Sequence, residues 1–262
     1  MTITVAWIRK AGKHEELVFA SDSRLRSYGS WDANPKIFPL ERTDCSISFA
    51  GDTHYSYPLI NQIQSFIKSY PKSQSRFQDL CHFKGHLLNM MNHMLTHKSD
   101  YEEPDVRFLF GGYSWDRKRY YLWHIHFDRN EKIFVAPEVT PWKGLKTPRI
   151  ISFVGDYYHE FRDRLISLMQ KRENFVDGHF DMEPFEVLRD MIRENAFERI
   201  GGPVQLLKVY EHMNRSPIAV KWNINQTQID TLLGRPLQDY ETNNYPCIDP
   251  DTLEINGGRL YG

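Results

Sequence analysis

The sequence predicts an α+β fold in which antiparallel sheets carry helices on their outer faces. The predicted elements come in blocks, as strands, two helices, strands, two helices and strands, and do not alternate as in a parallel sheet. Two such sheets placed face to face, each covered outside by a helix pair, would form a four-layer αββα sandwich. A chain of 262 residues can also bury a substantial core.

Runs of β-branched and aromatic residues predict the strands. Residues 2–9 and 17–22 are expected to form a hairpin, and 36–40 with 45–49 a second pair. A third group covers 106–110, 120–127 and 133–136, and the last two strands cover 204–209 and 218–222. The hairpin would bring the end of its second strand back toward residue 2.

Apolar residues at helical spacing predict four helices. The first begins after Asp52 or Thr53, which are both suitable N-caps, and the others cover about 76–97, 158–168 and 185–196. We assign residues 1–225 to one domain. Residues 226–262 are richer in Asn, Asp, Gly and Pro, and we expect them to form a C-terminal tail with a short helix at 227–233.

The composition excludes several classes of function. The 33 basic and 34 acidic residues give a formal charge of -1, which does not favour nucleic acid as a partner. Cys45, Cys81 and Cys247 are odd in number and far apart, which is typical of reduced thiols. Neither a signal-peptide pattern nor an apolar run of about 18 residues is present. We therefore expect a cytoplasmic protein that does not bind membranes.

Four histidines form a stripe on the helix expected at 76–97. His82 and His86, and likewise His93 and His97, are spaced four residues apart, a spacing that can chelate a metal. No carboxylate completes the first pair, and no Glu lies between paired histidines as in zinc peptidases. We interpret the stripe as a polar or inter-subunit face, and we expect neither a metal nor another cofactor.

The first fifty residues contain the groups needed for nucleophilic catalysis. Thr2 follows Met1 directly, and a small second residue permits removal of the initiator methionine. Removal would leave a threonine with both a hydroxyl and a free α-amine. Asp22 ends the second expected strand, Lys36 begins an apolar strand, and Gly51 ends the strand after it. The combination predicts an N-terminal nucleophile with a carboxylate and a lysine nearby.

The run Phe19–Arg24 resembles the second strand of the proteasome β-subunit family of N-terminal nucleophile hydrolases, which includes the bacterial peptidases HslV and Anbu. The resemblance extends over about residues 2–222 and also implies the αββα sandwich. It implies that Thr2 is the nucleophile, Lys36 the catalytic lysine and Asp22 the carboxylate beside it. The backbone N–H of Gly51 would serve the oxyanion hole. Phe49 would lie near the base of the substrate pocket, and Leu25 and Asn34 are further candidate substrate-binding residues.

Two groups could act as the base that activates the hydroxyl of Thr2. The α-amine has an ordinary pKa near 8, so it is partly neutral at physiological pH. Lys36 could serve if burial lowers its pKa, although the neighbouring Asp22 would oppose that change. The sequence leaves this choice open.

The chain departs from the family where polar side chains usually support the terminal amine. A serine and an aspartate–serine pair are replaced by Val154, Phe197 and Ile200. Three neighbouring polar residues could substitute for them: Ser152, Asp156 and Glu198.

We therefore expect a threonine peptidase that cleaves peptides or unfolded proteins through an acyl-enzyme on Thr2. The resemblance implies a homo-oligomeric ring and an ATP-dependent unfoldase as partner. One alternative is a non-catalytic, proteasome-like scaffold that recruits partners. The other is an amidase that acts on a small amide.

Overall fold

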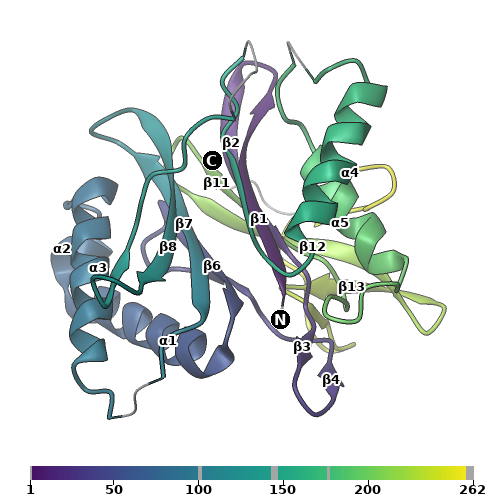
Figure 1. Ribbon diagram of the computed structural model, residues 1–262. Coiled ribbons are helices and arrows are strands. Elements are labelled where there is room, and N and C mark those ends of the chain that lie inside the picture. Colours follow the sequence, from purple (N-terminus) through teal and green to yellow (C-terminus); the bar gives the residue numbers. More distant parts are fainter. Residues whose placement is uncertain (1, 100–101, 143–146, 176–177, 258–262) are drawn as a thin grey trace.

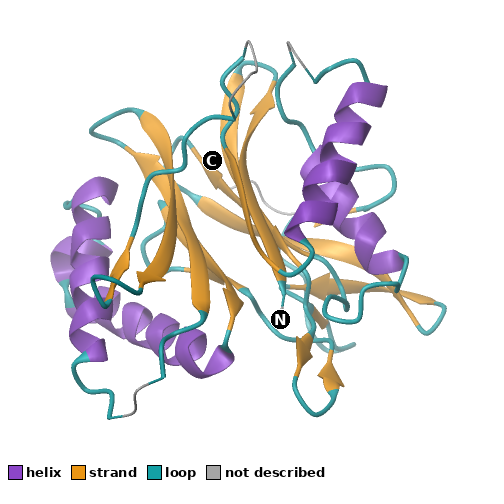
Figure 2. Cartoon of the chain, in the orientation of Figure 1, coloured by secondary structure: helices purple, strands orange, loops and turns teal. Residues whose placement is uncertain are grey.

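The computed structural model describes residues 2–99, 102–142, 147–175 and 178–257. Figure 2 shows two groups of strands next to each other in the middle of the molecule, with helices on the outer side of each. Within each group, neighbouring strands are antiparallel except for one parallel pair. The prediction of antiparallel sheets with helices packed on them is confirmed.

The larger sheet has nine strands among the described residues, seven of them in the spatial order β10-β1-β2-β11-β12-β13-β14. The bounds of these seven strands are β1 Ile3–Ala11, β2 His14–Ser21, β10 Ile151–Gly155, β11 Gln205–Tyr210, β12 Arg215–Ile224, β13 Thr227–Leu232 and β14 Arg235–Pro236. Two short strands extend it beside β12: β15 Cys247–Ile248 and β16 Ile255–Asn256. The expected first hairpin is present as β1 and β2, which turn at Gly12 with a φ of 64°.

The smaller sheet has five described strands in chain order: β5 Ile37–Pro39, β6 Cys45–Gly51, β7 Val106–Ser114, β8 Arg119–Asp128 and β9 Ile133–Val135. Between β2 and β5, a small ribbon pairs β3 Leu25–Arg26 with β4 Ser30–Trp31. This ribbon projects from the lower edge of the molecule in Figure 1.

The five described helices are α1 Thr53–Ser69, α2 Pro71–Gln74, α3 Leu80–Leu95, α4 Tyr158–Lys171 and α5 Glu183–Arg193. The side chain of Asp52 accepts a hydrogen bond from the backbone N–H of His54, which confirms the expected N-cap of α1. The second expected helix starts later than residue 76 because Asp79 caps α3 in the same way. None of these described helices combines the length and the apolar character that spanning a membrane requires.

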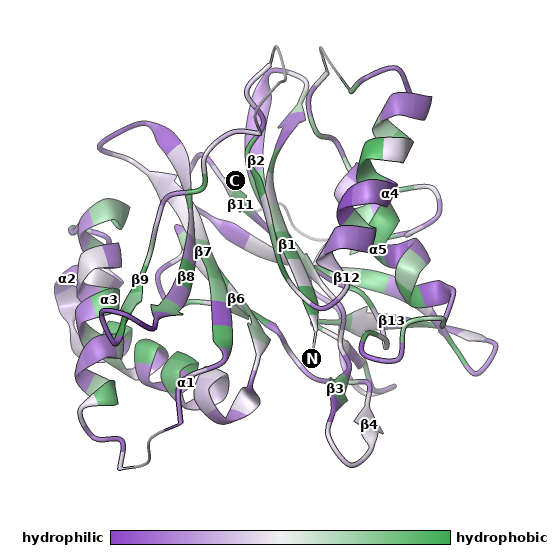
Figure 3. Ribbon diagram, in the orientation of Figure 1, coloured by the Kyte–Doolittle hydropathy of each residue, from purple (hydrophilic) through white to green (hydrophobic). Residues whose placement is uncertain are grey.

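Three apolar clusters hold the layers together. One lies between the nine-stranded sheet and α4 with α5, and a second between the five-stranded sheet and α1 with α3. The third joins the facing sides of the two sheets, where Phe19 and Leu207 from one meet Leu109 and Leu122 from the other. Figure 3 accordingly shows hydrophobic colouring along the central strands β1 and β6 and mixed colouring on α4. The central strands β1, β2, β6 and β7 thus bury both faces along most of their length.

The expected short helix at 227–233 is wrong, because this segment is β13. Asn225 and Gln226 both have positive φ values, 49° and 66°, which suit a two-residue hairpin turn. The turn pairs Ile224 with Thr227 and continues the sheet from β12 into β13. The tail is therefore hydrogen-bonded into the larger sheet.

One buried side chain ties the two sheets together next to the end of β2. Gln205 on β11 has no exposed surface. Its Nε2 donates to the backbone oxygens of Asp22 and Asn34 and to the hydroxyl of Ser23. Its Oε1 accepts from the backbone N–H groups of Lys36 and Ile37. A single amide thus fixes the ends of β2 and β5 relative to each other.

We predict that Gln205→Leu lowers the free energy of unfolding by about 3 kcal/mol or more, because several buried polar groups lose their partner together. Gln228→Leu, on an exposed position of β13, is the control and should change it by less than about 0.5 kcal/mol. Urea unfolding of both variants measures the difference. Equal stabilities would show that the Gln205 amide does not hold the sheets together.

Candidate functional site

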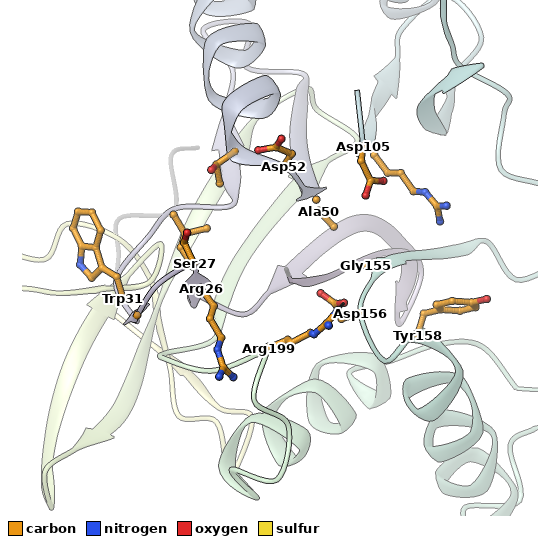
Figure 4. A pocket seen from close by; sticks show the side chains of 15 residues that line it. Arg26, Ser27, Trp31, Ala50, Asp52, Asp105, Gly155, Asp156, Tyr158 and Arg199 are labelled. Carbon is orange, nitrogen blue, oxygen red and sulfur yellow. Dashed lines mark hydrogen bonds and ion pairs between the residues drawn. The ribbon is translucent and has the colours of Figure 1, made fainter. Parts of the chain in front are cut away.

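A cleft of about 800 Å³ opens at the end of the molecule where β2, β6 and β10 finish. Its wall carries acidic and basic side chains in equal number: Asp52, Asp105, Asp156, Arg26, Arg107 and Arg199. Figure 4 shows most of these groups around the opening, together with Trp31 from the ribbon and Tyr158 from α4. The cleft is therefore polar and charged.

The carboxylate of Asp22 is the centre of the hydrogen-bond network behind the cleft. The side chain has no exposed surface. Its Oδ1 accepts from the backbone N–H of Ile3 at 3.1 Å and from Nζ of Lys36 at 2.9 Å. Its Oδ2 accepts from the N–H groups of Arg24 at 3.0 Å and Gly201 at 3.1 Å. Four segments of the chain therefore meet on one carboxylate.

Lys36 is equally buried and has one further partner, the carbonyl oxygen of Arg24. Burial lowers the pKa of the Lys36 ammonium, and the nearby Asp22 carboxylate only partly opposes this. Burial also raises the pKa of Asp22, against the effect of Lys36 and the backbone donors. Burial therefore disfavours the charged form of both groups, and their mutual contact offsets part of this effect.

Thr2 lies at the start of β1 and is only 1% exposed. Its backbone nitrogen donates to Oδ2 of Asp156 at 2.9 Å, and its carbonyl oxygen accepts from the N–H of Asp156 at 2.6 Å. Its hydroxyl is buried and has no hydrogen-bond partner among the described residues. The expected removal of Met1 concerns a residue outside the described part of the chain.

Two glycines at the cleft have a backbone conformation that favours glycine, and one of them, Gly155, packs against Thr2. Gly51 and Gly155 have φ values of 112° and 114°, which side-chain-bearing residues rarely adopt. A Cβ on Gly155 would lie 1.9 Å from the carbonyl oxygen of Thr2 and 3.1 Å from Cβ of Ala50. Both glycines line the cleft. The end of β6 therefore lies directly across Gly155 from Thr2.

The expected substrate-binding residues have different positions. Leu25 lines the cleft. Phe49 does not: its side chain has no exposed surface and packs against Tyr57, with ring centroids 5.3 Å apart. The strand alternation at β6 directs it toward α1, so its assignment to the pocket base is corrected. Asn34 is also buried, donates to the carbonyl oxygen of Trp31 and supports the loop from behind.

The apolar residues at the family's usual support positions all belong to packed clusters. Val154 lies between the sheets, Ile200 lies in the core under α5, and Phe197 packs against Tyr157. Of the polar neighbours, Glu198 pairs with Arg26, whereas Asp156 reaches Thr2.

Neither the histidine stripe nor any other described group forms a metal centre. Within the described ranges, no three His, Cys, Asp or Glu side chains gather closely enough to hold a metal ion. The rings of His93, in the last turn of α3, and His97, just beyond its end, have centroids 5.1 Å apart.

Sequence reasoning did not identify two groups of this site. Gln205 could have been recognised as a polar residue within the apolar run 204–209. Arg199 ion-pairs with Asp156 at 2.9 Å, and its contact across the fold leaves no local signal.

Comparison with solved structures finds a similar fold in a mutant of Anbu from Hyphomicrobium sp. strain MC1. The two chains are 14% identical with a TM-score of 0.55, and the match covers 82% of each. No family model matches the sequence, and no curated protein matches it. At this level of identity, the similarity shows a shared fold with a protein of the group that the run Phe19–Arg24 resembles.

Proposed function

We propose that this protein is a threonine peptidase of the proteasome type, with the Ntn αββα sandwich as its scaffold and Thr2 as its nucleophile. The observation that carries the proposal is the position of Thr2. Thr2 is hydrogen-bonded to Asp156, which lines the charged cleft, and its hydroxyl has no hydrogen-bond partner among the described residues. The next residue, Ile3, shares the Asp22 carboxylate with Lys36. A hydroxyl nucleophile needs a nearby group that can accept its proton.

After loss of Met1, Oγ of Thr2 attacks the carbonyl carbon of a peptide bond in the cleft. The hydroxyl proton passes to a base, the new Oγ–C bond forms, and the oxygen of the tetrahedral intermediate accepts from the N–H of Gly51. The C–N bond then breaks as the proton moves to the leaving amine. Water hydrolyses the resulting ester and restores the threonine.

Lys36 is well suited to hold and move the proton. Its pKa is lowered by burial, so the neutral amine needed in a base is more accessible than in an exposed lysine. Asp22 holds Nζ in place through the 2.9 Å contact. Leu25 and the ribbon residues beside it contribute to the substrate-binding wall.

The proposal extends to a cytoplasmic homo-oligomeric ring that encloses the clefts and receives unfolded protein from an ATP-dependent unfoldase. The polar, charged cleft would bind an extended peptide through its Asp and Arg side chains. The alternative of a non-catalytic scaffold is favoured by Val154, Phe197 and Ile200, because these packed, apolar residues replace polar supports of the terminal amine. The following variants separate these two functions.

We predict that Thr2→Ala lowers peptide hydrolysis on the order of 10⁴-fold or more, because it removes the attacking oxygen. Thr2→Ser keeps the oxygen and is the matched control. Turnover of fluorogenic peptides, with intact-protein mass spectrometry to establish loss of Met1, provides the measurement. Undiminished turnover in Thr2→Ala would rule out the mechanism, and retention of Met1 would favour the scaffold.

We also predict that Lys36→Met lowers kcat by about 10²- to 10⁴-fold, the usual contribution of a general base. Lys208→Met is the control, because Lys208 is another buried lysine whose pKa burial lowers and which pairs with a carboxylate, Glu16. Circular dichroism establishes that both variants fold. Equal kcat values in the two folded variants would contradict a role for Lys36 in proton transfer.

A further inference from the structure

Asp156 contacts Thr2 at the atom that becomes the terminal amine. We propose that Asp156, balanced by Arg199, is the positioning residue for the α-amine of Thr2, so that a carboxylate–guanidinium pair does what a serine hydroxyl usually does in the family. The inference rests on the proposed use of Thr2 as nucleophile. It adds a residue that orients the amine and changes the pKa of the amine.

Two hydrogen bonds fix Asp156 against Thr2. The backbone N–H of Asp156 donates to the Thr2 carbonyl oxygen at 2.6 Å, and Oδ2 accepts from the Thr2 nitrogen at 2.9 Å. Two contacts between the same pair of residues fix the orientation of the nitrogen as well as its distance. When Met1 leaves, this nitrogen gains further N–H groups, and the carboxylate is already within hydrogen-bond distance.

The backbone on both sides of Asp156 supports this orientation. Gly155 has a φ of 114°, and a side chain there would collide with Thr2. Tyr157, the N-cap of α4, has a φ of 58°. Two residues in the left-handed region thus flank Asp156, and the chain turns sharply enough to direct both its N–H and its carboxylate at Thr2.

Arg199 holds the other oxygen of the same carboxylate. Its guanidinium lies 2.9 Å from Oδ1 of Asp156, and the two side chains meet beneath the opening in Figure 4. Two residues further along, the N–H of Gly201 donates to Asp22. The segment 199–201 therefore contacts both carboxylates of the site and connects the amine to the Lys36 network.

A carboxylate has an electrostatic effect that a serine hydroxyl does not have. It stabilises the ammonium form of Thr2 and raises the pKa of the amine, whereas the positive charge of Arg199 opposes this rise. The charged and titratable groups around the amine and the cleft are Asp22, Lys36, Asp156, Arg199, Asp52, Asp105, Arg26, Arg107 and Tyr158. Of these, only Asp156 has a hydrogen bond to the Thr2 nitrogen among the described residues.

The test is the pKa of the Thr2 amine, measured by competitive labelling with acetic anhydride over a range of pH and read by mass spectrometry. Asp156→Asn keeps an oxygen acceptor but removes the charge, and it should lower the amine pKa by about one unit. Arg199→Gln should raise it, because the opposing cation is lost. Asp105→Asn and Arg107→Gln remove like charges from the same cleft and are the matched controls.

The proposal predicts shifts of opposite sign in the two test variants and smaller shifts in the controls. An unchanged amine pKa in Asp156→Asn, or Met1 retained on the purified chain, overturns the proposal. The labelling needs no turnover, so an amine that responds to Asp156 in a protein without peptidase activity would reject the proposed function and leave this inference standing.

Discussion

The arrangement of the site depends on one carboxylate, that of Asp22, which has no exposed surface. Asp22 accepts hydrogen bonds from the backbone N–H groups of Ile3, Arg24 and Gly201 and from Nζ of Lys36. Burying a charge is costly unless it is paired and hydrogen-bonded, so the donors must all be in place together. The cost of leaving this carboxylate unsatisfied therefore selects one relative position for β1, β2 and the segment before β5.

The amide of Gln205 extends this constraint from one sheet to the other. It binds the backbone of Asp22 on one side and that of Lys36 and Ile37 on the other. The Asp22–Lys36 pair and the amide of Gln205 consequently form a single buried hydrogen-bond network across the interface between the sheets. Such a network is rigid when every group is satisfied, which suits a site that must hold Thr2 in one place.

Apolar residues stand at the positions where the family that this sequence resembles usually has polar supports. Val154, Phe197 and Ile200 contribute to packing. The contact with the Thr2 nitrogen comes instead from Asp156, two residues beyond Val154 and at the end of β10. Asp156 also ion-pairs with Arg199, and a charged pair responds to the charge of its surroundings in a way that a hydroxyl would not.

The sequence by itself determined the grouping of most strands and helices, the β1–β2 hairpin and the N-cap at Asp52, because alternation, helical spacing and capping are local signals. It also identified Thr2, Asp22 and Lys36 as candidates. It did not predict β10 or the strands after β12. Only the tertiary structure decided which neighbour reaches the Thr2 nitrogen, that Phe49 faces the core, and that residues 227–232 join the sheet. These outcomes depend on contacts between segments far apart in the chain, such as Thr2 with Asp156, and no local pattern encodes them.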